Sequence, residues 1–436
     1  MRDFVRQCAR VMSRSPLALL MTRRLGPLAV AQACGALNDN LVKNAIIVLA
    51  LFKLGIGGAG LSAAAGALFI APYVILSASA GIVADRFAKA RVIAAYKAAE
   101  IVLMASAAIA FHLGSVTALL AVLLGLGIQA ALFGPVKYGV LPELLDEHEL
   151  VAGNGLIEAA TFLSIVTGTV AGGGLILLDR GVAVVGLLGV MLSVVGFACA
   201  LRIPRYPPAD PSLRLSPNLP GETWRVLRLA AADAPIRRCI LALSWFWTMG
   251  ATLLTELPVL ARDTLHAEGT VLTLLLAVFA IGVGVGSIGC ARLLAGEVSP
   301  RLVPFAALGI SVFCWDFASA GGASFDAATV ATVLGSLKGW RMMIDLFLLA
   351  ACGGIFSVPL YAIIQDRSAA SERSRMIAAN NIMNALFMVA GAAAAAGLAA
   401  AGLDAPRVLH VAAVANLAVA AWSLRLLVHH RRDLPA

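Results

Sequence analysis

Charged side chains are scarce in this chain. Its 436 residues are 13% charged and 61% hydrophobic, with a mean hydropathy of +0.92. A soluble domain carries about 25% charged residues. Half that charge cannot cover the surface of a water-soluble body of this length, so most of the outer surface must face lipid.

Motifs for several chemistries are also missing. Neither the phosphate-binding pattern G-x-x-x-x-G-K-[ST] nor the acyltransferase pattern H-x-x-x-x-D occurs. The seven cysteines are scattered, mostly within apolar runs, without a C-x-x-C, so we interpret them as small buried hydrophobes rather than metal ligands. Because no sizeable soluble domain is visible, the sequence predicts that the chain is not an enzyme and uses no cofactor or metal.

The chain instead contains long apolar runs rich in Ala, Leu and Gly, which are typical of membrane helices rather than of barrel strands. At about 20 residues per span, the length accommodates roughly twelve helices. The sequence therefore predicts an all-α membrane protein with spans near 27–50, 60–82, 92–113, 116–138, 150–178, 182–202, 238–261, 270–294, 302–320, 342–364, 376–402 and 406–428.

A proline-rich linker lies midway and divides the predicted spans into two groups of six. We expect five parts: a basic N-terminal segment, a first six-helix bundle, a cytoplasmic linker, a second six-helix bundle and a cytoplasmic tail. Their predicted boundaries are 1–24, 25–203, 204–237, 238–428 and 429–436.

The basic residues are distributed unevenly between the predicted loops. About 24 of the 33 Lys and Arg fall on the side that holds both ends of the chain and the linker. The positive-inside rule then places both ends in the cytoplasm. We interpret the net charge of +9 as a topology signal, with anionic lipid headgroups as its counter-ions rather than nucleic acid.

The first 24 residues carry a basic stripe. Arg2, Arg6, Arg10 and Arg14 recur every four residues, which places them on one face of a helix. This segment is either a positive topology anchor or an interfacial amphipathic helix that gathers anionic lipid.

The two halves also resemble each other in sequence. FGPVKY at 133–138 ends the fourth span, and FSVPLY at 356–361 lies near the end of the tenth. After each comes a polar loop and then an Asn early in the next helix, Asn154 in one half and Asn380 in the other. The fourth span thus matches the tenth, and the fifth matches the eleventh. A duplicated six-helix unit predicts this correspondence.

The short loop between the second and third spans holds the strongest local motif. Residues 81–91 read GIVADRFAKAR, which resembles the signature G-x-x-x-D-R-x-x-[KR]-x-[KR] of the major facilitator superfamily. Glycine allows close helix contact, aspartate can cap a helix or pair with a cation, and basic residues face headgroups. The alternative is a solvated basic loop. The resemblance implies a latch that holds the two halves in the outward-facing state, formed by Gly81, Asp85, Arg86 and Arg91.

The first span contains an unusual polar turn, NDNLVKN at 38–44. A charge at the bilayer centre costs about 2.5 to 3.5 kcal/mol on insertion scales, so these side chains must face the bundle interior or a wet cavity. Asp39 and Lys43 are four residues apart and can neutralise each other. A purely structural ion pair is the alternative to a substrate site.

Other polar side chains fall within predicted spans and can line the same cavity. Lys97 and Glu100, on the third span, are spaced to pair with each other. Trp245 and Trp247 lie inside the seventh span rather than at its ends, so at least one of them is expected to face a cavity. The remaining candidates are Gln129, Lys137, Tyr138, Asn154, Glu158, Thr161, Tyr361, Gln365, Asn380, Asn381 and Asn384.

One motif imitates a nucleotide site. GVGSIG at 284–289 matches G-x-G-x-x-G, but it lies within a predicted span and no strand precedes it. We interpret these glycines as helix-packing positions.

Four phrases in order along the chain resemble the lysophospholipid transporter family. They are ALNDN at 36–40, FGPVKY at 133–138, ELVAGNGLIE at 149–158 and VPLYAIIQ at 358–365. They are similar also to the transporter domain that some bacteria fuse to an acyltransferase and an acyl-carrier synthetase.

The resemblance implies the major facilitator fold and import of lysophospholipids, chiefly lysophosphatidylethanolamine, from the outer to the inner leaflet of a bacterial inner membrane. It implies a monomer, and it assigns substrate contacts to Asp39, Asn40, Lys137, Tyr138 and, less directly, Glu158. An added outer segment at 322–341 resembles the fused version, whose catalytic domains are absent here. Either a cytoplasmic acyltransferase partner re-acylates the product, or this branch moves a different lipid.

Two other functions compete with lysophospholipid transport. A proton-coupled exporter of amphipathic drugs or metabolites would use a titrating carboxylate such as Asp39 or Glu158. A membrane anchor that recruits an acyltransferase without transporting anything would depend on the linker and not on the cavity.

Overall fold

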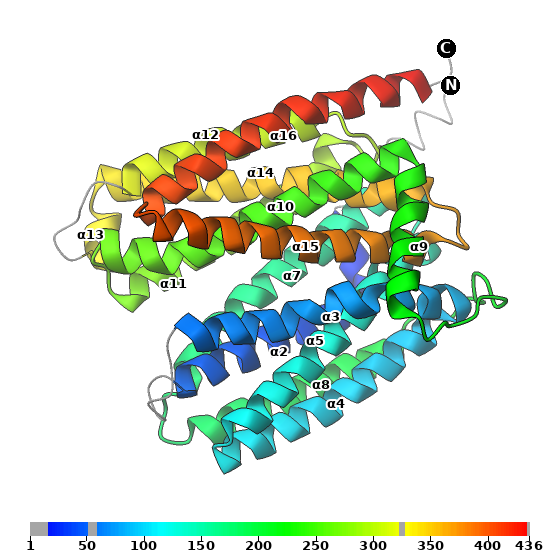
Figure 1. The fold of residues 1–436 in the computed structure, drawn as a ribbon, viewed down its shortest axis with the longest axis horizontal. Helices are drawn as coiled ribbons and strands as arrows, with labels where there is room; N and C mark the ends of the chain where they lie inside the picture. The colour runs from blue at the N-terminus through cyan, green and yellow to red at the C-terminus, as the bar shows by residue number, and fades with distance from the viewer. Residues whose placement is uncertain (1–15, 51–58, 322–327, 434–436) are drawn as a thin grey trace.

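The fold was analysed in a computed structural model, which describes residues 16–50, 59–321 and 328–433. Every regular element in these ranges is a helix (Figure 1). The predicted stripe of Arg2, Arg6, Arg10 and Arg14 lies outside the described residues, as do the first residues of the added outer segment. The all-α prediction is confirmed.

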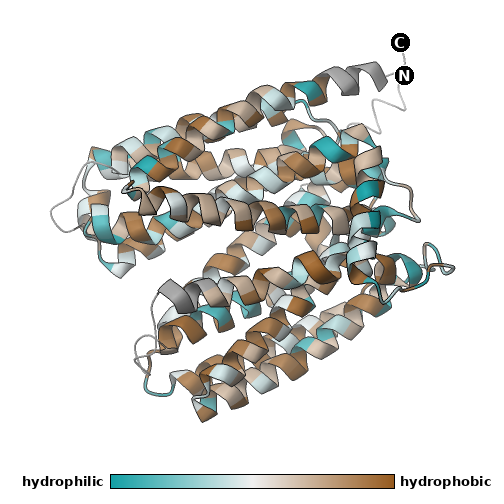
Figure 2. Cartoon of the chain, in the orientation of Figure 1, coloured by the Kyte–Doolittle hydropathy of each residue, from teal (hydrophilic) through white to brown (hydrophobic). Residues whose placement is uncertain are grey.

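Eleven of the described helices are long and apolar enough to cross a membrane. A further long helix, α2 (Gly26–Val48, 23 residues), carries Asp39, Lys43 and several amides and is not among them. The predicted twelve spans therefore correspond to eleven apolar helices and one long helix with a polar turn. Figure 2 shows hydrophobic residues along the helices and hydrophilic ones gathered near α9 (Leu219–Ala232).

The long helices form two bundles, which lie below and above the middle of Figure 1. The N-terminal bundle consists of α2, α3 (Ala59–Arg86), α4 (Lys89–Leu113), α5 (Val116–Gly139), α7 (Glu147–Leu175) and α8 (Gly181–Ala200). The C-terminal bundle consists of α10 (Ala234–Val259), α11 (Gly269–Leu293), α12 (Val303–Gly321), α14 (Leu337–Arg367), α15 (Arg373–Ala400) and α16 (Ala405–Asp433). Shorter helices are η1 (Pro16–Met21), α6 (Leu141–Leu144), η3 (Leu260–Thr264) and α13 (Val330–Leu334).

Several helix ends have clear chemical causes. Ser115 accepts a hydrogen bond from the N–H of Ala118 at the start of α5, and Asp233 accepts one from the N–H of Ile236 at the start of α10. Gly114 ends α4 in the left-handed conformation. Such caps satisfy backbone groups that a helix leaves unpaired at its ends. They set the helix lengths before any packing between helices.

The central linker contains α9, a helix that the sequence analysis did not anticipate. Asn218 caps it, and its buried residues Glu222, Val226 and Ala230 recur every four positions along one face. That face packs against α3 of one bundle and against α10 and α15 of the other. Trp224, by contrast, is 69% exposed. The linker therefore bridges both bundles at one end of the molecule.

Close helix packing explains the nucleotide-like motif on α11. A Cβ added at Gly286 would lie 2.0 Å from the backbone oxygen of Ala351 on α14. At Gly289, one turn further, an added Cβ would meet nothing within 4 Å. The interpretation of the motif as a packing surface is confirmed at Gly286, where only glycine lets the two backbones approach.

We predict that Gly286→Val lowers stability because α11 and α14 must separate, an overpacking cost of about 1–3 kcal/mol or more. Gly289→Val, on the same helix and of the same size, is the matched control. Thermal unfolding of the detergent-purified variants measures the difference. Equal melting temperatures for the two variants would contradict this account of the motif.

Candidate binding cavity

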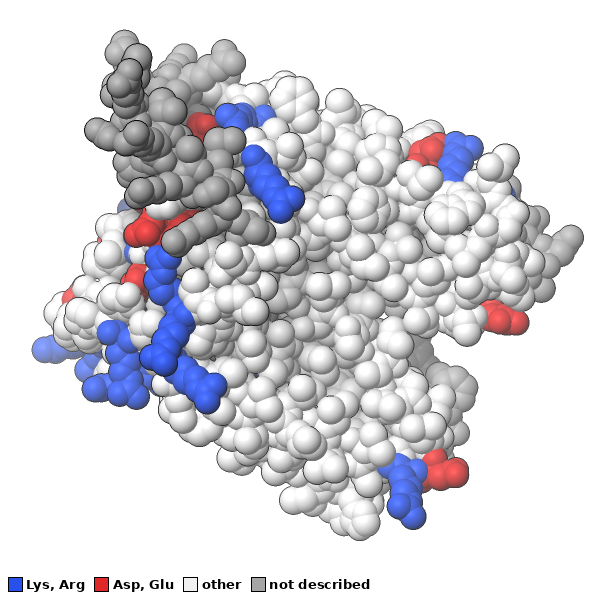
Figure 3. Space-filling model, turned by 180° about the vertical axis from the view of Figure 1, so that it is seen from behind, with Lys and Arg blue, Asp and Glu red and all other residues white. Residues whose placement is uncertain are grey.

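A cavity of about 360 Å³ lies between the two bundles and is lined by both. Figure 3 shows the molecule hollowed at the end opposite the cluster of basic side chains. Six of the eight side chains predicted to bind substrate line this cavity: Asp39, Asn40, Lys43, Lys137, Tyr138 and Tyr361. The structure thus brings together residues that lie up to several hundred positions apart in sequence.

The polar turn of α2 faces this cavity, but its internal pairing differs from the prediction. The Lys43 ammonium donates a hydrogen bond of 3.1 Å to Oδ1 of Asn40, and Asn40 donates one of 2.8 Å to the carbonyl of Ala36. Among the described residues no direct salt bridge joins Asp39 to Lys43, although the two charges still interact electrostatically. Asp39 and Lys43 lie on the same face of α2, but the Lys43 ammonium bonds to the nearer amide of Asn40. Asp39 keeps one buried oxygen without a hydrogen-bond partner.

The predicted Lys97–Glu100 pair is confirmed, with an N–O distance of 2.6 Å and both side chains buried. Glu100 also accepts hydrogen bonds of 3.1 Å from Asn38 of α2 and from Gln129 of α5. A buried charge is tolerated when such bonds satisfy it. Periodicity predicted the pair, but only the packing of three helices shows that Asn38 and Gln129 complete it.

The N-terminal bundle therefore supplies an ionic face to the cavity. Lys43, Lys97 and Lys137 line it together with Asp39, and Glu100 lies directly behind Lys97. The Lys137 ammonium is 4.5 Å from the centre of the Tyr138 ring, a distance suited to a cation–π contact. Formally this face carries three positive and two negative charges, so it can bind both an anionic and a cationic group of one ligand.

The C-terminal bundle supplies most of the aromatic and aliphatic surface of the cavity. Trp247 stacks on Phe162 of α7, in the opposite bundle, with ring centroids 5.8 Å apart, and its indole N–H donates a 3.0 Å hydrogen bond to the Tyr361 hydroxyl. Phe246 and Phe279 line the same side. The prediction that Trp247 faces a cavity is confirmed, whereas Trp245 instead donates its N–H to Asn416 within the bundle.

Two tyrosines at matching positions of the two halves meet on the boundary between the bundles. Tyr138 and Tyr361 stack with centroids 4.4 Å apart and planes 9° from parallel. Each ends its repeat of the six-residue phrase that suggested an internal duplication. Their contact forms the floor of the cavity on the side of α9.

Beneath this floor, amide and carboxyl groups connect α7 to α14. Asn154 and Gln365 exchange two hydrogen bonds, of 2.6 and 3.0 Å, and Gln365 donates a third to the Tyr138 carbonyl. Glu158 accepts a 2.6 Å hydrogen bond from the Ser357 hydroxyl. In this conformation Glu158 therefore joins the bundles and does not line the cavity.

Asn380 is also placed outside the cavity lining. Its side chain is 0% exposed. Its neighbours Asn381 and Asn384 line the cavity instead. The sequence identified the correct turn of α15 but could not tell which asparagine points inward, because that depends on the rotation of the helix.

The latch motif of α3 contacts the first turn of α15. The buried Asp85 carboxylate accepts hydrogen bonds from the N–H groups of Ser374 (3.1 Å) and Arg375 (3.3 Å), so it caps a helix of the opposite bundle. A Cβ at Gly81 would lie 2.9 Å from Cα of Arg375, which explains the glycine. Lys89 and Arg375 pair with Asp85 at 3.8 and 3.5 Å.

Arg86 and Arg91 do not share in this contact. The Arg86 guanidinium lies 5.2 Å from the Phe87 ring, and Arg91 is exposed. Within the described part of the chain neither is bonded to the other bundle, so their predicted latch role finds no support. Lys89 belongs to the same motif and was overlooked as a partner; Arg375 gave no signal in sequence.

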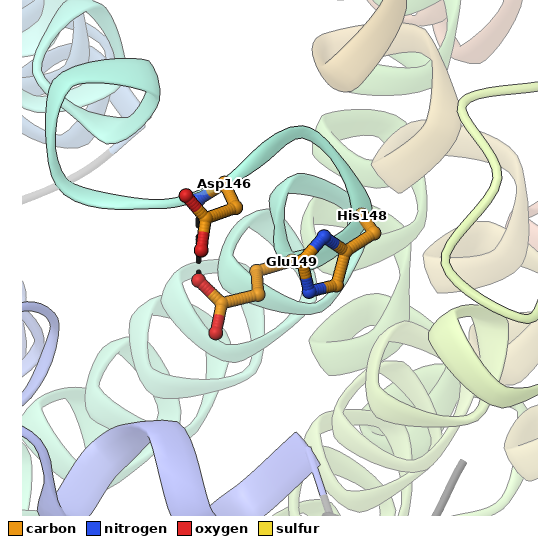
Figure 4. A group of neighbouring side chains, drawn as sticks. All are labelled: Asp146, His148 and Glu149. Atoms are coloured by element: carbon orange, nitrogen blue, oxygen red, sulfur yellow. Dashed lines mark hydrogen bonds between the residues drawn. The ribbon is translucent and has the colours of Figure 1, made fainter. Parts of the chain in front are cut away.

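One group of metal-ligand types lies away from the cavity. Asp146, His148 and Glu149 have donor atoms within 4.8 Å of one another (Figure 4). Asp146 and Glu149 form the capping box of α7, and Arg24 pairs with both, at 3.5 and 2.7 Å. Helix capping and ion pairing account for this cluster.

Comparisons with known proteins agree with the geometry. The sequence profile of the Major Facilitator Superfamily matches residues 28–337. The Lysophospholipid transporter LplT of Serratia proteamaculans is 30% identical over 351 residues, covering 80% of this chain and 81% of that protein. Its counterpart in Pectobacterium carotovorum is 30% identical over 370 residues, covering 82% and 81%.

Solved structures share the fold at low sequence identity. The human organic anion transporter MFSD10 superposes with a TM-score of 0.74 at 13% identity, covering 93% of this chain and 99% of that one. A bacterial homologue of the iron transporter ferroportin gives 0.68 at 14% identity, covering 94% and 99%. The chain is a multi-pass membrane transporter that belongs to the major facilitator superfamily and, within it, to the lysophospholipid transporter family.

Proposed function

We propose that this chain carries lysophospholipids, chiefly lysophosphatidylethanolamine, from the outer to the inner leaflet of a bacterial inner membrane. The observation that carries the proposal is that one cavity combines lysines and carboxylates, all on the N-terminal bundle, with an aromatic and aliphatic surface that lies mostly on the C-terminal bundle. The 30%-identical relatives named as lysophospholipid transporters support it.

A lysophospholipid matches both faces of the cavity. Lys43 and Lys137 can bind its phosphate. Asp39, which has a buried oxygen without a hydrogen-bond partner, can bind its ammonium group. Its single acyl chain needs apolar surface, which Trp247 and its neighbours provide. Burying a charged headgroup without such partners would cost several kcal/mol per ion.

The two bundles are in contact at the end that carries α9, and alternating access explains why the cavity is closed at that end. The exposed Lys and Arg gather at the end that carries α9, whereas at the other end Arg262, Arg341 and Arg407 pair with nearby carboxylates (Figure 3). By the positive-inside rule the α9 end is cytoplasmic, and the conformation is outward-facing. Release to the inner leaflet requires the contacts between Tyr138 and Tyr361 and between Asp85 and α15 to break.

We predict that Asp39→Asn and Lys137→Gln each reduce lysophosphatidylethanolamine transport at least about tenfold. Each removes one charge that faces the headgroup, and a hydrogen bond to a charged group contributes about 1.5–3 kcal/mol. The measurement is flipping of fluorescent lysophosphatidylethanolamine in proteoliposomes, followed by quenching of the outer leaflet.

Asp404→Asn is the matched control, because Asp404 is a 55%-exposed carboxylate in the loop before α16. Wild-type activity in both cavity variants would contradict the site. Flipping that requires a proton gradient would favour proton-coupled transport. If the cavity variants kept full function and changes in residues 204–237 abolished it, the result would favour a membrane anchor that recruits an acyltransferase.

We also predict that Asp85→Asn shifts the protein toward the inward-facing state. The variant weakens the cap on α15 and the ion pair with Arg375, which exist only while the cytoplasmic end is closed. A loss of about 2 kcal/mol corresponds to a roughly thirtyfold shift in population. Spin labels at Arg202→Cys and Ser371→Cys, in a background without native cysteines, report the separation of the bundles at this end.

The control for the latch is again Asp404→Asn. The Asp404 carboxylate bonds to Arg407 near the start of α16 and has no contact with Asp85 or Arg375 among the described residues. A longer-distance population should appear in Asp85→Asn and not in the control. Identical distance distributions in the two variants would show that Asp85 does not hold the bundles together.

A further inference from the structure

A second hollow lies on the outside of the N-terminal bundle, at the end that carries α9. It is an open groove of about 470 Å³ beside the first two turns of α4, and residues 205–208 of the linker form its other wall. The Asp210 N–H donates a 2.9 Å hydrogen bond to the Asp85 carbonyl at the end of α3, which fixes the linker there. We call this hollow the α4 groove and define it by Phe87, Arg91, Ala95, Arg205 and Tyr206.

Both charged side chains that line the α4 groove are positive. Arg91 comes from the first turn of α4 and Arg205 from the linker, and both are exposed. In the described part of the chain neither guanidinium forms an ion pair, and no carboxylate lines the groove. An anion in the groove would therefore contact two arginines without a competing counter-ion. Guanidinium groups bind phosphate strongly because their N–H donors match its oxygens.

Two aromatic rings flank these arginines. Phe87 is 45% exposed and Tyr206 is 39% exposed, and both line the α4 groove. Tyrosine and arginine are favoured where a membrane meets water, because each has an apolar body and a polar end. The side chains of the groove are therefore those of a site at the level of the lipid headgroups.

An exposed stripe continues from the α4 groove along α4. The exposed residues recur every three or four positions: Arg91, Ala95, Ala99, Val102, Ser106 and Ile109. Residues at this spacing share one face of a helix, and α4 lies on the outside of its bundle (Figure 1). Val102 is 66% exposed and Ile109 is 62% exposed, so this face contacts acyl chains in a bilayer. The groove thus joins a basic site to a lipid-facing surface.

We infer that the α4 groove binds one anionic phospholipid of the inner leaflet, with its phosphodiester between Arg91 and Arg205 and its acyl chains along the exposed face of α4. A zwitterionic headgroup fits less well, because no lining carboxylate is present to pair with its ammonium. A soluble phosphate ester would contact the arginines and leave the apolar stripe unused. The site lies outside the central cavity, so it does not depend on which substrate the chain carries.

Native mass spectrometry of the detergent-purified full chain tests this directly. Palmitoyl-oleoyl-phosphatidylglycerol and palmitoyl-oleoyl-phosphatidylcholine are titrated separately, and the affinity of the first bound lipid is compared. The test variant combines Arg91→Gln with Arg205→Gln. The matched control combines Arg228→Gln with Arg292→Gln, which removes two exposed arginines at the same end of the molecule, on α9 and at the end of α11.

We expect the wild type and the control to bind phosphatidylglycerol at least about tenfold more tightly than phosphatidylcholine, and the test variant to lose that preference. The reason is that charge-assisted hydrogen bonds to the phosphate are lost only in the test variant. Equal losses in the test variant and the control would show diffuse attraction of anionic lipid and overturn the site. Loss in Lys137→Gln with retention in the test variant would place the lipid in the central cavity and also overturn it.

Two measurements on the unaltered protein distinguish a lipid from a soluble phosphate ester. Displacement of phosphatidylglycerol by millimolar glycerol phosphate would show that the groove takes the soluble ester, which overturns the lipid site. Phosphatidylglycerol with a diazirine in its acyl chain is then irradiated with the protein, and labelled peptides are identified by mass spectrometry. Labelling of the α4 peptide that contains Ala95 and Val102, competed by unlabelled lipid, supports the site. Labelling spread over all lipid-facing helices without preference for α4 contradicts it.

Discussion

The cost of placing ionisable groups inside a membrane-embedded protein governs the N-terminal bundle. Asp39, Lys43, Lys97, Glu100 and Lys137 all lie at the level of the spans, where an unsatisfied charge costs several kcal/mol. Each must therefore face a partner or the cavity. This requirement sets the rotation of α2, α4 and α5 about their axes and directs their polar sides to one place. The ionic face follows from it.

Closure at the α9 end depends on the same physics in a different form. Asp85, Gln365 and Glu158 are buried between the bundles, and each is bonded to a group of the opposite bundle. These bonds exist only while the bundles are together at this end. Because polar groups can exchange such partners for water when the bundles separate, this boundary can open, whereas an apolar core could not without exposing its surface. Glycines such as Gly81 let the backbones approach closely enough for the bonds to form.

The two bundles share a fold but have diverged in chemistry. Tyr138 and Tyr361 still occupy matching positions and stack across the boundary. Around them the N-terminal bundle presents lysines and carboxylates, and the C-terminal bundle presents Trp247, Phe246 and Phe279. An asymmetric pair of faces suits a ligand that is itself ionic at one end and apolar at the other.

The sequence by itself determined the membrane class, the helical spans, the latch motif and most of the polar residues that meet in the cavity. These follow from composition, helical period and the cost of buried charge, which are local properties. Only the tertiary structure decided which groups pair. Asp39 and Lys43 share a face, yet Asn40 takes the ammonium; Arg375, distant in sequence, joins Asp85; and Asn381 rather than Asn380 faces the cavity. Such choices depend on the rotation and approach of helices from different parts of the chain.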